Sequence, residues 1–178
     1  MHACIADVLA DTAQNSIEAG ASKIEVTLAE TGGRISVEIR DNGKGMDAAT
    51  VARAFDPFYT EAGKHDKRKV GLGLPILRQI CEATGGEVSL ESEKGVGTVL
   101  KYCFDANHID LPPMGDLPGV MITLFNYPGD FELVFTHKRG DEEYSISRIE
   151  LSEAVGGLES VDSLALAKEF LISQEESL

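Results

Sequence analysis

The stretch from residue 34 to residue 46 constrains the fold more than any other part of this sequence. In RISVEIR (34–40) apolar and polar side chains alternate, which is typical of a strand with one buried face. The strand runs directly into DNGKGM (41–46), in which an acidic residue is followed closely by two glycines. Asp, Asn and Gly are common turn residues, so the hexapeptide alone predicts a turn. The same residues also suit the floor of a nucleotide site.

Two hairpins are predicted in the first 105 residues. KIEVTLAE (23–30) alternates in the same way as RISVEIR, and Thr31-Gly32-Gly33 connects the two strands. A second hairpin is expected over residues 87–93 and 97–104. These pairs predict a sheet that is mostly antiparallel.

Helical spacing of apolar residues predicts three helices in the same region. They are expected over residues 3–19, over residues 48–55, and from the glycines of VGLGLPIL (70–77) onward. The apolar stripe of the first helix consists of Ile5, Val8, Leu9, Thr12, Ala13, Ser16 and Ile17. Residues 58–69 show little periodicity and are predicted to form a mobile loop.

The character of the chain changes after residue 105. Three prolines mark residues 106–119 as a linker. Alternation then predicts strands at 120–127, 131–138 and 143–151, followed by a helix over 161–172 and a loose tail. Residues 120–178 are therefore expected to form a small α+β segment, a β-meander with one helix, that either binds a partner or extends the main sheet.

Composition narrows the possible functions. The net charge is −14 and the pI is near 4.6, so the field of the protein repels nucleic acid phosphates and anionic lipid. The three cysteines are widely spaced and form no metal-binding pattern. No stretch approaches the roughly 18 apolar residues of a membrane span, and the acidic N-terminus does not resemble a signal peptide. We expect a cytoplasmic protein that binds neither nucleic acid nor membrane.

The first predicted helix carries a polar face. Asp7, Asp11, Asn15 and Glu18 follow one another at spacings of four, four and three residues, so they share one side of the helix. Such a face is often merely solvated. Asn is nevertheless a poor residue for a helix interior, and an Asn oxygen beside a carboxylate suits Mg²⁺, which prefers hard oxygen ligands and phosphate.

The segment VGLGLPIL offers a second chemical feature. Glycines that open a helix leave backbone N–H groups free to meet a phosphate. The pattern is neither the Walker motif nor the dinucleotide-binding motif. Four of the sixteen Lys and Arg residues lie just before this segment: Lys64, Lys67, Arg68 and Lys69. An acidic chain would need such positive charges near a bound polyphosphate.

The order of these motifs resembles the GHKL superfamily of ATP-binding domains. The matching segments are D-x-x-x-N with NSIEAGA, DNGKGM, FDPFYT, and VGLGLPILRQICEATGGEVSLESEKGVGT, all within residues 1–105. The later segments are most similar to the catalytic domain of sensor histidine kinases, and NSIEAGA is more similar to MutL. The resemblance implies a two-layer α/β sandwich of the Bergerat type, with helices on one face of a mixed, mostly antiparallel sheet.

The resemblance also implies roles for individual residues. Asn15 would ligate Mg²⁺ that bridges the phosphates of ATP, and Asp41 would accept a hydrogen bond from the adenine amine. Gly43 and Gly45 would let the backbone approach the ring. Phe55 and Phe58 would lie at the root of a lid, and Gly71 and Gly73 would admit the phosphates. The remaining implied ATP-binding residues are Leu72, Leu74 and Thr98.

Asp11 is the implied candidate for a general base, because hydrolytic relatives carry a Glu four residues before the Asn. A helix-surface role and a role near Mg²⁺ are alternatives. None of the four histidines lies in the helical context of a phosphoacceptor. We therefore expect a domain that binds Mg·ATP and transfers the γ-phosphoryl group to a partner protein or to water. The alternative is a non-catalytic module whose C-terminal segment docks a partner when nucleotide binds.

Overall fold

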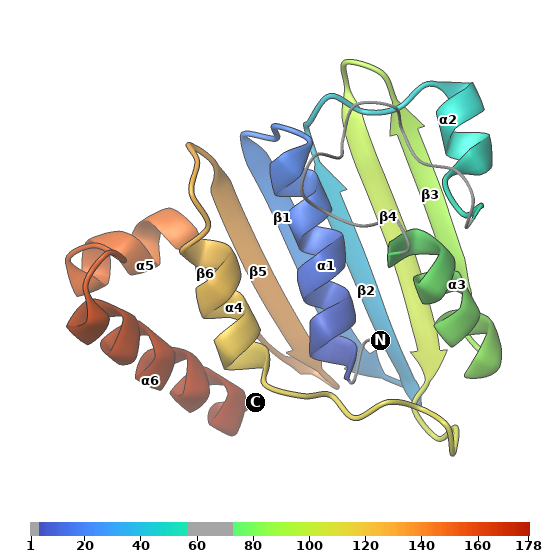
Figure 1. Ribbon diagram of the computed structural model, residues 1–178. Coiled ribbons are helices and arrows are strands. Elements are labelled where there is room, and N and C mark those ends of the chain that lie inside the picture. The colour runs from blue at the N-terminus through green and yellow to red at the C-terminus, as the bar shows by residue number, and fades with distance from the viewer. Residues whose placement is uncertain (1–3, 57–72) are drawn as a thin grey trace.

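A computed structural model describes residues 4–56 and 73–178 of the chain (Figure 1). Within these residues six strands form one mixed sheet in the order β3-β4-β2-β1-β5-β6. Only β1 and β5 pair in parallel among the described strands. The strands are β1 (Lys23–Thr31), β2 (Arg34–Asp41), β3 (Val88–Glu93), β4 (Gly97–Asp105), β5 (Glu132–Arg139) and β6 (Glu142–Ser147).

Helices α1, α3 and α4 lie over one face of this sheet (Figure 1). The predicted two-layer sandwich is confirmed. No helix of the described part is long and apolar enough to cross a membrane. The helices are α1 (Ile5–Glu18), α2 (Ala48–Arg53), α3 (Gly73–Ala83), α4 (Leu117–Phe125), α5 (Arg148–Val155) and α6 (Val161–Ser177).

Helix α1 follows the predicted pattern closely. Its apolar stripe, which includes Ile5, Leu9 and Ala13, is buried against the sheet. Full burial of such large aliphatic side chains contributes about 1.5–3 kcal/mol each. The helix ends before Gly20, whose φ of +72° suits glycine. The sheet and the helices therefore share one apolar core.

The alternation of β2 sets the direction of its last side chain. Ile35, Val37 and Ile39 are buried beneath the helices, while the residues between them face outward. Because side chains alternate with a period of two, Asp41 points to the same side as Ile39. The carboxylate that follows the apolar run is thus directed toward α1.

The prediction of a strand at residues 120–127 is wrong, since these residues belong to α4 and its C-terminal end. The Asp116 side chain caps the helix by accepting a hydrogen bond of 2.9 Å from the Gly119 backbone N–H. Pro118 lies in the first turn, where proline is tolerated. The segment is apolar almost throughout, so its sequence is compatible with the period of a strand and with that of a helix. The buried residues of this segment recur at helical spacing, so packing favours the helix. They are Leu117, Met121, Leu124 and Phe125.

The rest of the C-terminal segment also differs from prediction. Strand β6 ends at Ser147, whose hydroxyl caps α5 by accepting from the Glu150 N–H at 3.2 Å. The predicted loose tail is helical, because α6 continues to Ser177. Strands β5 and β6 do not form a separate meander; β5 pairs with β1 and extends the main sheet. Of the two alternatives that the sequence left open for these strands, extension of the main sheet is the one observed.

Candidate functional site

Asp41 and Ser16 form a buried polar pair between β2 and α1. Asp41 is 9% exposed and Ser16 is 5% exposed. The Ser16 hydroxyl donates to Asp41 Oδ2 at 2.6 Å, and the backbone N–H of Gly43 donates to Asp41 Oδ1 at 2.9 Å. Each carboxylate oxygen thus accepts one hydrogen bond from a neutral donor. A carboxylate has about four acceptor sites in all, so the group can accept further hydrogen bonds.

Hydrogen bonds hold the loop after Asp41 at both ends. Asn42 Oδ1 accepts from the backbone N–H groups of Ser22 and Lys23, both at 2.9 Å. Further along, the Lys44 N–H donates to the Ala19 carbonyl oxygen at 3.0 Å. The Met46 N–H donates to Ser92 Oγ at 2.9 Å on the other side. The loop is therefore tied to the end of α1 and to β3.

The glycines of this loop are required by the packing of the protein itself. A Cβ on Gly45 would lie 1.9 Å from the Glu93 carbonyl oxygen, and the φ of Gly45 is +59°. A Cβ on Gly97 would lie 2.0 Å from the Asp41 carbonyl oxygen. A Cβ on Gly43 would meet the Ala19 backbone and side chain at 3.0 Å. Close backbone contact between the loop and the β3–β4 hairpin is thus a reason for glycine that sequence analysis did not identify.

The polar face of α1 is exposed at three of its four residues, and Asp7 is half-buried. Asp11 and Asn15 are both exposed on this helix, and Asn15 immediately precedes Ser16. Because Ser16 contacts Asp41, the turn of α1 that carries Asn15 lies against the end of β2. Asp11 lies about one turn earlier on the same helix.

Four other predicted site residues belong to the described part of the chain. Thr98 is the register partner of Asp41 on β4, and its hydroxyl lies 2.8 Å from Ser92 Oγ. Phe55 follows α2, and its ring centroid is 6.0 Å from Cζ of Arg78 on α3. Gly73 and Leu74 are the first two residues of α3. The other predicted site residues lie outside the described residues: Phe58, Lys64, Lys67, Arg68, Lys69, Gly71 and Leu72.

A depression of about 460 Å³ has Asp41 in its lining, together with residues on the face of the sheet opposite the helices. Its lining includes Glu25, Arg40 and Val99, which form one cross-strand row. Their neighbours along the strands are the buried residues that face the helices. This depression is therefore distinct from the space beside Asn15 and Ser16.

No group of three or more His, Cys, Asp or Glu side chains in residues 4–56 and 73–178 could hold a metal ion. The exposed amide of Asn15 is a hard oxygen ligand of the type that Mg²⁺ uses together with phosphate oxygens. The donor set thus fits Mg²⁺ that arrives with a nucleotide and does not fit a metal held by protein ligands alone.

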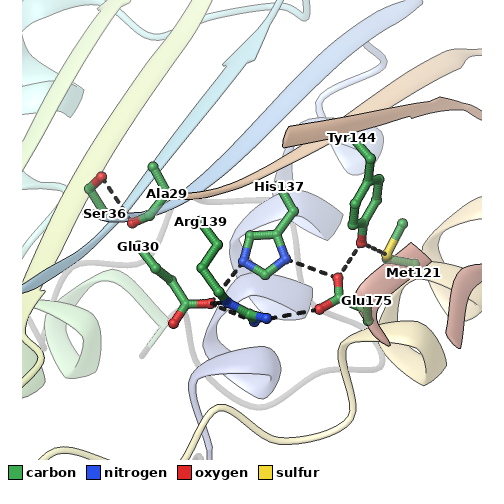
Figure 2. A network of polar contacts seen from close by, with 8 residues as sticks. All are labelled: Ala29, Glu30, Ser36, Met121, His137, Arg139, Tyr144 and Glu175. Atoms are coloured by element: carbon green, nitrogen blue, oxygen red, sulfur yellow. Dashed lines mark hydrogen bonds and ion pairs between the residues drawn. The ribbon is translucent and has the colours of Figure 1, made fainter. Parts of the chain in front are cut away.

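A second polar cluster lies at the other end of the sheet (Figure 2). His137 on β5 is fully buried, with Nε2 2.9 Å from Glu30 Oε1 and Nδ1 2.9 Å from Glu175 Oε1. Arg139 forms an ion pair of 2.9 Å with Glu30, and the Tyr144 hydroxyl donates to Glu175. None of these contacts is predicted by the sequence. They join β1, β5, β6 and α6, so the cluster fastens the last helix to the sheet.

The contacts of Glu175 lower the pKa of its carboxyl group. Burial alone would raise the pKa of Glu175, but hydrogen bonds with His137 and Tyr144 together hold that pKa below its ordinary value of 4.5. Burial is also the main cause that raises the pKa of Tyr144, followed by its hydrogen bond to Glu175. The cluster therefore keeps the carboxylate charged and the phenol neutral.

The fold and the Asp41 loop define a class of protein: a two-layer α/β sandwich in which an acidic strand end faces a helix. The chain belongs to the family of histidine kinase-, DNA gyrase B- and HSP90-like ATPases, whose model matches residues 4–108.

The curated relatives are sensor proteins. The chain is 33% identical over 84 residues to the sensor histidine kinase YvrG of Bacillus subtilis, covering 47% of this chain and 14% of that protein. It is 40% identical over 81 residues to the heme sensor protein HssS of Staphylococcus saprophyticus, covering 46% of this chain and 17% of that protein. The chain thus spans less than a fifth of the length of these relatives.

One solved structure is similar over most of the chain. The N-terminal domain of a DNA repair protein has a TM-score of 0.60 and 15% sequence identity, and the match covers 90% of this chain and 58% of that chain. At this identity the likeness shows the fold alone. It extends well beyond residue 108, so most of the C-terminal segment belongs to the shared fold.

Proposed function

We propose that this chain binds Mg·ATP at the end of β2 and transfers the γ-phosphoryl group to a partner protein or to water. The observation that carries the proposal is the buried Asp41 carboxylate, oriented by two neutral donors and with acceptor sites left over. Family membership supports ATP as the nucleotide. The similarity to sensor histidine kinases supports a place in phosphotransfer signalling.

Base recognition follows from the chemistry of the carboxylate. An ionised Asp accepts hydrogen bonds and donates none. The adenine amine is a donor and matches it, whereas guanine presents a carbonyl oxygen at the same position and would oppose acceptor with acceptor. Asp41 therefore selects adenine over guanine.

The phosphates would lie along α1 toward Asn15. A Mg²⁺ ion bound with the nucleotide would supply neutralisation of part of the phosphate charge. Asn15 would contribute its amide oxygen to that ion. The exposed Asp11, about one turn away, is the proposed base that accepts a proton from water or from a hydroxyl group on the partner.

Calorimetric titration with a non-hydrolysable ATP analogue tests the proposal. We expect binding that becomes tighter when Mg²⁺ is added, and an Asn15→Ala variant in which the effect of Mg²⁺ is reduced. Absence of binding at millimolar analogue would contradict the proposal. Turnover is tested separately with Asp11→Asn, which should bind the analogue normally and lose phosphate release.

A non-catalytic docking module is the second candidate function. The observation that favours it is the exposure of large apolar side chains on α5 and α6: Leu166 is 54% exposed, Phe170 is 44% exposed and Ile149 is 47% exposed. Exposed apolar groups of this kind are found where proteins bind partners. The two functions differ in the Asp11→Asn variant, which would retain every activity of a docking module.

A further inference from the structure

Ser16 does not behave as the core residue that its position in the apolar stripe predicts. It is almost completely buried, yet its hydroxyl reaches across from α1 to Asp41 on β2, 25 residues away in the sequence. Thr12, one turn earlier, shows the common alternative: its hydroxyl donates to the Val8 carbonyl oxygen of its own helix at 2.8 Å. The hydroxyl of Ser16 is thus directed at the carboxylate.

The direction of this hydrogen bond is fixed. An ionised carboxylate only accepts, so the Ser16 O–H must donate to Asp41 Oδ2. The Gly43 N–H donates to the other carboxylate oxygen, Oδ1. Together the two donors fix the rotation of the carboxylate about its last side-chain bond.

We propose that Ser16 is a positioning residue that sets nucleotide specificity through Asp41. This inference rests on the proposed function, because it concerns the same site. Without the hydroxyl, Asp41 keeps the Gly43 N–H as its one donor among the described residues, and the carboxylate can turn. A carboxylate that can turn is able to move its oxygens away from the guanine carbonyl oxygen, which a carboxylate held in place repels. Removal of the hydroxyl therefore relaxes the preference for adenine in addition to weakening the binding of ATP.

The experiment compares the affinities of non-hydrolysable ATP and GTP analogues, with Mg²⁺, for the full chain and its variants. Ser16→Ala is expected to lower the ATP-to-GTP affinity ratio about tenfold. Ser16→Thr, which restores a hydroxyl, is expected to keep the preference for ATP. Ser16→Cys has nearly the size of serine but a weak donor, and its ratio should fall between those of the wild type and Ser16→Ala.

Thr12→Val is the matched control, because it removes a buried hydroxyl from the same helix that does not contact Asp41. Its ratio should equal that of the wild type even if its stability is lower. An unchanged ratio in Ser16→Ala, or in Ser16→Cys if the alanine variant does not fold, would overturn the role of Ser16 and leave the ATP site standing. A wild-type chain that binds neither analogue would instead overturn the proposed function.

Discussion

Asp41 and His137 are both buried ionisable residues on strands of the same sheet, but their surroundings differ. Asp41 has two neutral hydrogen-bond partners, a hydroxyl and a backbone N–H. His137 has a carboxylate oxygen 2.9 Å from each ring nitrogen, and Arg139 adds a second basic group beside the same carboxylates. Asp41 thus retains unused acceptor sites, whereas both ring nitrogens of His137 are already bonded.

This difference separates a binding group from a structural one. Every buried side-chain polar atom in the described part of the chain has a hydrogen-bond partner, so neither residue is left unsatisfied. The partners of His137 come from several elements of the fold and leave no site for a ligand. Asp41 is held in one orientation by few contacts, which is the arrangement that recognition of an external donor requires. Burial of a charged group alone therefore does not identify a functional site.

The largest expected effect is on stability, at the His137 cluster. His137→Ala removes two hydrogen bonds, one to the Glu30 carboxylate and one to the Glu175 carboxylate, and a hydrogen bond to a charged group contributes about 1.5–3 kcal/mol. Denaturant unfolding measures this change. The affinity for nucleotide should stay constant. His108→Ala is the control, since His108 lies on a partly exposed loop and its loss should change stability by less than about 0.5 kcal/mol. Equal effects of the two changes would contradict a structural role for the cluster.

Backbone packing of the Asp41 loop is tested next, with Gly45→Ala. Gly32→Ala is a matched control, because Gly32 has nearly the same φ (+61°) but open space around its Cβ position. A side chain in this left-handed conformation costs about 1–2 kcal/mol at either position. Gly45→Ala should cost at least about 1 kcal/mol more, from the overlap with the Glu93 carbonyl oxygen. Thermal or denaturant unfolding of both variants measures the difference in their free energies of unfolding. Similar losses of stability would show that the loop backbone can shift at little cost.

Asp41→Asn tests whether the Asp41 carboxylate recognises adenine. Replacing one carboxylate oxygen by an amide nitrogen introduces a donor where the adenine amine also donates. We expect the affinity for the ATP analogue to fall at least tenfold, about 1.4 kcal/mol. Asp105→Asn is the control: it makes the same chemical change at the end of β4, seven register pairs away from Asp41. An unchanged affinity in Asp41→Asn would count against adenine recognition at this site.

The smallest expected effect is a dependence of stability on pH. The pKa of Glu175 is lower in the folded chain than its ordinary value of 4.5, so the unfolded chain binds the proton more readily. The contribution of Glu175 is therefore complete above about pH 4.5 and is lost as the pH falls through the lower folded value. Unfolding midpoints measured from pH 3 to pH 7 should show a shallower acid decline in Glu175→Gln than in the wild type. Parallel curves would contradict this assignment.

Sequence alone determined most of the N-terminal fold and the composition of the candidate site. Strands β1 to β4 and helix α1 were predictable because each has a clear local period and is bounded by turn residues. The direction of Asp41 also follows locally, because it continues the alternation of Ile35, Val37 and Ile39. Residues 57–72 lie outside the described structure, so the predictions made for them stay predictions.

Tertiary structure decided the features in which distant residues meet. The apolar segment of α4 fits the period of a strand and that of a helix, and packing decided for the helix. Asp116 and Pro118 are signals in the sequence that could have predicted the start of this helix. Ser16 could be recognised only as a hydroxyl within an apolar stripe, since its partner lies on another element. His137 appeared as an ordinary strand residue. The parallel pairing of β5 with β1 brings its ring to Glu30, and α6 supplies Glu175. Periodicity is a property of neighbouring residues, whereas the choice of partner depends on how the elements pack.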